Sequence, residues 1–384
     1  VPTDTDLHLR RTDYVILVVL LVVVSTLAFQ LSGEIRRFDA NSPSLSTNSY
    51  MDSHTIAVLP LVNLSEDDTE QFFVDGMHDT LISMLSHVSA LKVISRTSAR
   101  RYATTDKSLV EIGRELGAAN IIEGSVIRQG SIIRINIQLI DAASDQLLWA
   151  NIYDKPIEDV LRLQSELART IAGEVQVLLT PEESAYLASV DRVVPEAYEN
   201  YLKGRFHWYR FGENDLNLAL EYFQTSIDID PKYALAYVGL ADATATRAHI
   251  GLMPATHVFP KAIKLLEHAL ELDPLLAEAH DLSAGIKFVW NFDWLGADRG
   301  FRESIRLMPS HPDVRIVYSQ FLGIQGRWEE SLNQVKVGLE LDPLNDWFRI
   351  ELGSRQSWMG NNDEARDEYL LIASEQPNCC LLYT

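Results

Sequence analysis

The longest apolar run of the chain lies near its start, from Tyr14 to Leu31, and contains no charged residue. As a helix rising ~1.5 Å per residue it would extend about 27 Å, close to the hydrocarbon thickness of a bilayer. A cleaved signal peptide would have a shorter apolar core and small residues at the cleavage site, and a buried soluble helix would keep one polar face. The pattern therefore predicts a single transmembrane helix over residues 14–32, preceded by a short tail at 1–13.

Charged and polar residues flank this predicted helix on both sides. Arg10 and Arg11 precede it and Arg36 and Arg37 follow it, so the positive-inside rule gives no orientation. Residues 33–53 are rich in Ser, Asn, Asp and Pro, a composition typical of a solvated linker. We therefore expect the rest of the chain to lie on one side of the membrane, joined to the helix by this linker.

Residues 54–180 change repeatedly between strand-like and helix-like patterns. Apolar and polar residues alternate strictly from Ile133 to Leu139, which indicates a sheet with one solvent-exposed face. Gly130 stands between two of the predicted strands and indicates a hairpin. The predicted elements are a strand (55–62), a helix (70–88), a strand (91–94), a helix (109–116), three strands (120–128, 132–141, 146–153) and a closing helix (157–179). This β-α-β-α-β-β-β-α order predicts a compact α/β domain.

Three segments of this domain resemble a known family. They read IAVLPLVNLSEDDTEQFFVDGMHDTLISMLS, LKVISRTSARRY and EIGRELGAANIIEGSVIRQGSIIRINIQLIDAASDQLLWANIYD. In this order they resemble the TolB-like amino-terminal domain. The resemblance implies an extracytoplasmic module of a bacterial signalling protein, placed between one transmembrane helix and tetratricopeptide repeats. It also implies an inner-membrane protein whose N-terminus is cytoplasmic and whose remainder is periplasmic. In such proteins a cytoplasmic effector precedes the helix, and this effector is a winged-helix domain, a nucleotide cyclase or a kinase.

Residues 195–377 contain an internal repeat that is marked by prolines. These are Pro231, Pro274, Pro309, Pro343 and Pro377, separated by 43, 35, 34 and 34 residues, and 34 is the tetratricopeptide period. The residues twelve positions before each proline are all small: Ala219, Ala262, Ala297, Ser331 and Ala365. Those eight positions before are all apolar: Phe223, Leu266, Phe301, Val335 and Tyr369. Antiparallel helices approach closely only at small side chains, so the array resembles an all-α tetratricopeptide solenoid.

Both ends of the chain lead us to expect a longer protein. The first residue is Val1 rather than methionine, and the tail at 1–13 is too short to hold an effector domain. A solenoid normally closes with a polar capping helix, whereas residues 378–384 follow the last repeat directly. The missing cap favours truncation at that end.

The first helix of each tetratricopeptide pair lines the concave face of the solenoid, and counting back from the prolines selects one stripe on it. The stripe residues in the last two repeats are Asp313, Ile316, Gln320, Trp347, Ile350 and Ser354. Trp347 and Ile350 would be exposed apolar side chains, which suits an anchor site for a peptide partner. The alternative is that they pack against a further element of the chain.

The charge and the sequence motifs of the chain exclude several classes of function. The 54 acidic and 33 basic residues give a net charge of −21, which disfavours contact with nucleic acid. The two cysteines, Cys379 and Cys380, are adjacent, so a disulfide framework and a four-cysteine zinc site are excluded. No phosphate-binding loop, dinucleotide fingerprint, metalloprotease motif or nucleophile elbow occurs. We therefore expect no catalysis, no cofactor and no metal in this polypeptide.

These features together predict a non-catalytic, membrane-anchored sensory or scaffolding protein that binds proteins or peptides through its repeats and its α/β domain. It would be the extracytoplasmic part of a signalling or transcription-regulatory protein. Two alternatives stay open. In one, the α/β domain is a small-molecule receptor that the repeats support. In the other, the chain is the regulatory part of a nucleotide cyclase or kinase whose catalytic domain lies upstream.

Overall fold

The computed structural model describes residues 52–65, 70–189 and 193–375. The predicted tail at 1–13, the predicted transmembrane helix at 14–32, most of the linker and the end at 378–384 lie outside the described residues. Within the described ranges, no helix combines the length and the apolar character that crossing a bilayer would need.

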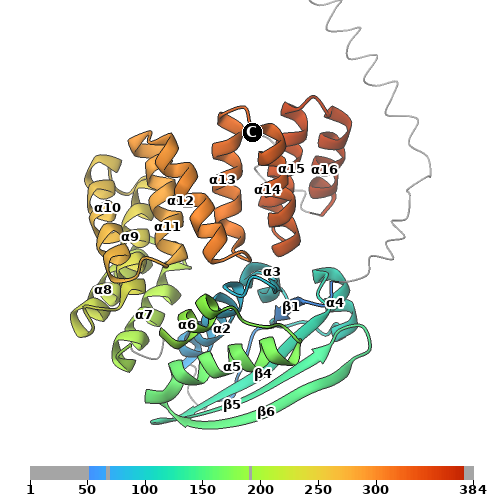
Figure 1. The fold of residues 1–384 in the computed structure, drawn as a ribbon, viewed down its shortest axis with the longest axis vertical. Helices are drawn as coiled ribbons and strands as arrows, with labels where there is room; N and C mark the ends of the chain where they lie inside the picture. The colour runs from blue at the N-terminus through green and yellow to red at the C-terminus, as the bar shows by residue number, and fades with distance from the viewer. Residues whose placement is uncertain (1–51, 66–69, 190–192, 376–384) are drawn as a thin grey trace, which may run out of the picture. The chain divides into compact units, whose positions relative to one another are not determined.

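A mixed sheet forms the centre of the α/β domain (Figure 1). Its strands are β1 (Thr55–Val58), β2 (Val62–Asn63), β3 (Lys92–Val93), β4 (Asn120–Gln129), β5 (Ile132–Asp141) and β6 (Gln146–Pro156). The order is β3-β1-β4-β5-β6, with β2 also paired to β4. β1 runs parallel to both of its neighbours, whereas β4, β5 and β6 form the predicted antiparallel meander. The single strand expected over 55–62 is instead two strands, because Pro60 has no N–H and the chain rejoins β4 further along, at Ser125.

Helices cover the two faces of this sheet unequally. α2 (Gln71–Ser86) and α5 (Val160–Glu174) pack on one face and share a core with the inward residues of β4 and β5. α4 (Leu109–Leu116) covers part of the other face, with a capping box at its start and left-handed Gly117 at its end. The alternation predicted for β5 is confirmed, since Ile133, Ile135 and Ile137 are fully buried.

Two short helices of this region were not predicted. α3 (Arg96–Arg100) begins where the Ser95 side chain accepts the N–H of Ser98. α6 (Pro181–Ser189) follows α5, which ends five residues earlier than expected. The expected continuation is wrong because Gln176 takes a left-handed conformation, and Leu178, which lies within the expected helix at 157–179, is 92% exposed.

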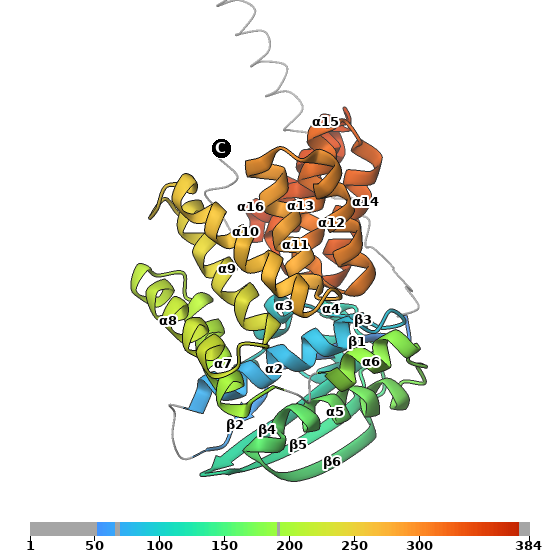
Figure 2. The same ribbon diagram turned by 60° about the vertical axis from the view of Figure 1, so that its left-hand side comes forward.

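The remaining described helices form successive antiparallel pairs, which follow one another through the yellow-green to red part of the chain in Figures 1 and 2. They are α7 (Pro195–Trp208), α8 (Glu213–Ile229), α9 (Ala234–His249), α10 (Ala255–Leu272), α11 (Ala277–Ile286), α12 (Trp294–Leu307), α13 (Pro312–Ile324), α14 (Trp328–Leu341), α15 (Asp346–Trp358) and α16 (Asn362–Glu375). The small residue predicted at each helix contact is buried in all five pairs. The tetratricopeptide-like register is therefore confirmed.

Turns of the repeats bind directly to the β3 edge of the sheet. The N–H of Val93 donates to Ser310 Oγ (3.1 Å), and the Ser310 hydroxyl donates to the carbonyl oxygen of Leu91 (3.0 Å). In the next inter-repeat turn, between α14 and α15, Asp342 Oδ1 accepts hydrogen bonds from the hydroxyls of Ser95 and Ser98. The bond from Ser98 is 2.6 Å long. Asp342 is fully buried, so these bonds form away from water.

We predict that Asp342→Ala destabilises the protein by about 2–4 kcal/mol, because two buried serine hydroxyls lose their acceptor. The matched control is Asp273→Ala, which removes the residue at the same repeat position. Among the described residues, the Asp273 side chain accepts only the N–H of Leu275 in its own turn, so its removal should cost about 1 kcal/mol or less. Urea unfolding of both variants measures the difference. Equal losses would show that Asp342 acts only within its own turn.

Candidate partner-binding groove of the repeats

The first helices of neighbouring pairs contact one another, as α7 does α9 and α13 does α15, and they form the inner face of the array. On α13 the structure places Asp313 largely in solvent and Ile316 half-buried. Ile316 packs against a cluster that includes Phe348 of the next pair, and the Gln320 amide donates to Glu351 at 2.8 Å. The predicted stripe on α13 is therefore partly used to join two repeats.

The stripe on α15 shows the same pattern, with one exposed residue followed by two half-buried ones. Trp347 is 37% exposed and Ile350 is half-buried, while Ser354 shares a hydrogen bond with the hydroxyl of Tyr369 (3.1 Å). The structure thus brings all six predicted residues onto two adjacent inner helices. Of these residues, Trp347 and Asp313 are the most exposed, and their role in binding a partner stays a prediction.

A series of carboxylates lies on the inner helices. The stripe counted from the prolines includes Asp281 in the third repeat and Asp313 in the fourth, whereas Asp242 was missed. Asp242 on α9 and Asp281 on α11 precede Asp313 of α13 along the array. Burial, with a contribution from the charge of Asp313, raises the pKa of Asp242 to about 6 and that of Asp281 to about 7. Counting forward from the preceding proline would have found Asp242, which stands eleven residues after Pro231 just as Gln320 stands eleven residues after Pro309.

The α/β domain covers the inner face of the first repeats (Figure 2). The hydroxyls of Thr80 and Tyr198 share a hydrogen bond of 2.8 Å between α2 and α7. The Arg96 guanidinium lies 3.8 Å from the centroid of the Tyr209 ring and forms an ion pair with Asp79. The inner face of the first repeats therefore lies against α2 and α3.

A buried polar junction lies at the C-terminal end of α2. His87 stacks on Tyr186 of α6 with a ring separation of 3.8 Å, and desolvation lowers the pKa of His87. Within the described part of the chain, His87 Nε2, Glu278 Oε2 and His311 Nδ1 are buried without a hydrogen-bond partner. Such atoms cost about 1–3 kcal/mol each, so this junction is electrostatically unsatisfied.

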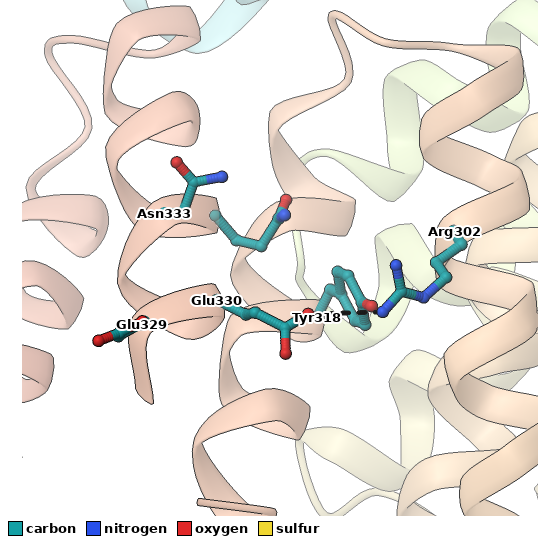
Figure 3. A pocket seen from close by; sticks show the side chains of 6 residues that line it. Arg302, Tyr318, Glu329, Glu330 and Asn333 are labelled. Carbon is teal, nitrogen blue, oxygen red and sulfur yellow. Dashed lines mark ion pairs between the residues drawn. The ribbon is translucent and has the colours of Figure 1, made fainter. Parts of the chain in front are cut away.

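A hollow of about 320 Å³ lies among α12, α13 and α14 (Figure 3). Its walls are Arg302, Tyr318, Glu329, Glu330, Asn333 and Gln334. The charged groups here pair with each other: Arg302 binds Asp298 at 2.8 Å and Arg327 binds Glu330 at 2.6 Å. Nothing in this arrangement provides a nucleophile with an adjacent base, and the described residues contain no group of His, Cys, Asp or Glu arranged to hold a metal ion.

Comparison with known proteins gives relatives for both halves of the chain. Residues 52–170 match a family model described as the second domain of HilA/YgeH-like transcriptional regulators. A putative adenylate cyclase from Rhizobium meliloti (strain 1021) is 37% identical over 187 residues, covering 49% of this chain and 32% of the relative. The transcriptional regulator HilA of Salmonella typhimurium is 21% identical over 334 residues, covering 84% of this chain and 56% of HilA. The chain thus spans about a third to just over half of these relatives.

Solved structures similar to the repeats include two tetratricopeptide proteins. A thermophilic one from Thermus thermophilus is 15% identical, with a TM-score of 0.39, covering 49% of this chain and 95% of that structure. YrrB, described as having an unusual peptide-binding site, is 17% identical, with a TM-score of 0.36, covering 53% of this chain and 96% of that structure. Residues 52–170 are thus similar to the HilA/YgeH-like second domain, and they precede the tetratricopeptide-like helix pairs described above. The finer TolB-like resemblance stays a prediction.

The raised pKa of Asp281 predicts an unusual pH dependence of stability. The pKa of an aspartate in the unfolded chain is ~4, whereas that of Asp281 in the folded protein is about 7. Between these two pH values the folded state binds the proton more tightly than the unfolded state does. The free energy of unfolding therefore falls as pH rises through this range. Asp281→Asn should therefore stabilise the protein, by about 2 kcal/mol at pH ~8 and by less at pH ~5. Urea unfolding at the two pH values measures this change.

Asp298→Asn serves as the control of opposite sign. Burial of Asp298 would raise its pKa, but hydrogen bonds from Arg302 and Arg327 outweigh this and hold the pKa below its usual value. Its replacement should destabilise the protein near neutral pH. A pH-independent effect of Asp281→Asn would contradict the prediction.

Proposed function

We propose that this chain is the non-catalytic, partner-binding region of a membrane-anchored bacterial signalling protein. In this proposal the repeats bind a protein or peptide along their inner face, and the α/β domain transmits the bound state towards the membrane. The likeness to HilA and to a putative adenylate cyclase supports a signalling role, because both are named as regulators or signal-generating enzymes.

The observation that carries the proposal is the bonded junction between the two halves. Asp342 and Ser310 belong to turns between repeat helices, yet their side chains bind β3 and the start of α3. A partner that changes the curvature of the array would therefore act on the sheet through buried hydrogen bonds. A flexible linker between independent domains could not transmit such a change.

The anchor and the location form the second part of the proposal. Tyr14–Leu31 is long and apolar enough to hold the chain in the inner membrane, and the TolB-like resemblance implies that the bulk lies in the periplasm. The strong negative charge agrees with a role that involves no contact between this polypeptide and nucleic acid.

The effector that the chain serves would be a separate cytoplasmic domain. The 37% identity to a putative adenylate cyclase favours a nucleotide cyclase, and the likeness to HilA favours a transcription-regulatory domain as the second candidate. We predict that the reading frame continues upstream of the Val1 codon and encodes one of these two effectors. Sequencing the gene and its transcript start tests this, and a stop codon in frame just upstream of a start codon at Val1 would contradict it.

The inner face is tested by site-specific photo-crosslinking in cells. A benzoylphenylalanine at Ile350 should crosslink to a discrete partner, whereas the same group at Glu364 on the outer helix α16 should not. Adding Trp347→Ala should weaken the Ile350 crosslink roughly tenfold while leaving the melting temperature nearly unchanged, because the indole is partly exposed. Equal crosslinking from both faces, or from neither, would refute binding along the inner face.

A further inference from the structure

The carboxylates of the inner face repel one another. Asp242, Asp281 and Asp313 come from three successive first helices, and the charge of Asp313 acts on both of the others. Asp281 is also affected by the charges of Asp242 and Glu278. Four acidic groups thus share one stretch of the groove, where partial burial strengthens their repulsion.

Nearby cations of the described chain act on this stretch only at long range and form no short ion pair with Asp242, Asp281 or Asp313. The charge of Arg205 acts on Asp242, but the Arg205 guanidinium bonds to the Tyr209 hydroxyl and packs against the Trp208 and Tyr209 rings. His311 lies 4.0 Å from Asp281 and 3.9 Å from Asp313, at the limit of an ion pair. Of the described charged groups, none forms an ion pair within 4.0 Å of Asp242.

Unsatisfied hydrogen-bonding atoms lie at the same place. His87 is only 5% exposed and its Nε2 has no hydrogen-bond partner, and Glu278 Oε2 and His311 Nδ1 likewise have no hydrogen-bond partner among the described residues. These three groups interact electrostatically, so they lie close to one another. A carboxylate oxygen without a donor is the complement of an ammonium or guanidinium group.

We propose that this stretch of the groove binds a segment of a partner protein that carries lysine or arginine side chains. The cationic groups would pair with Asp242, Asp281 and Asp313 and supply the donor that Glu278 Oε2 lacks. Apolar residues of the same segment would lie against Trp347 and Ile350, further along the inner face. Charge complementarity thus selects a basic segment over an acidic one. This proposal rests on the proposed function and names the chemistry of its partner.

The test uses the full chain, purified in a nonionic detergent, and a fluorescein-labelled peptide that repeats Lys-Ser-Leu. Its counterpart repeats Gln-Ser-Leu. The test variant combines Asp242→Asn, Asp281→Asn and Asp313→Asn. The control variant removes as many charges from the first turns of outer helices, by Glu213→Gln, Glu329→Gln and Glu364→Gln. Fluorescence anisotropy measures affinity, and thermal melting shows that both variants fold.

We expect the lysine peptide to bind at least roughly tenfold more tightly than the glutamine peptide, and the test variant to lose most of this preference. The control variant should bind almost as the parent does, and raising the salt concentration should weaken the parent more than the test variant. Equal loss in both variants would overturn the proposal by showing a non-specific charge effect. Equal binding of both peptides along the inner face would overturn it while leaving the proposed function intact. Tight binding of free spermidine with no binding of the lysine peptide would overturn it in favour of a small cation.

Discussion

The unpaired edge of β3 is the constraint on which the arrangement of the molecule depends. An edge strand presents free N–H and C=O groups with which another strand can pair. β3 is such an edge strand and is only two residues long. Here a serine hydroxyl takes the place of the next strand, since Ser310 accepts from Val93 and donates to Leu91. The repeats therefore complete the sheet, and this contact helps to fix the position of α13 relative to β3.

Asp342 extends the same junction by one repeat. A carboxylate taken out of water requires several donors, and it obtains them from Ser95, Ser98 and the side chain of Asn345. Because Ser98 Oγ also accepts the N–H of Leu344, the start of α3 and the turn before α15 share a small buried network. Networks of this kind hold a fixed geometry, since breaking one member leaves the others unsatisfied. Two turns of the array are thus fixed to one edge of the sheet.

The sequence predicted those features that depend on local periodicity. The meander of β4, β5 and β6 and the register of the helix pairs follow from alternation and from small residues at fixed intervals, and both are observed. The five residues of α3 carry no apolar period, so a pattern search cannot find that helix. Asp342 precedes a proline just as Asp230 and Asp273 do, and nothing in the sequence distinguishes the one that the fold buries against another domain. Long-range contacts decide such roles.

The distribution of satisfied and unsatisfied charge separates the two sides of the repeat array. On the outer side, Arg302, Arg327, Asp298 and Glu330 neutralise each other, which is the arrangement expected where only solubility and stability matter. On the inner side, Asp242 and Asp281 retain carboxylates that the fold itself disfavours. Asparagine or leucine at these positions would stabilise the helices without this electrostatic cost. A groove that keeps such charges beside exposed Trp347 has the composition of a binding surface, in which the partner supplies the missing countercharge.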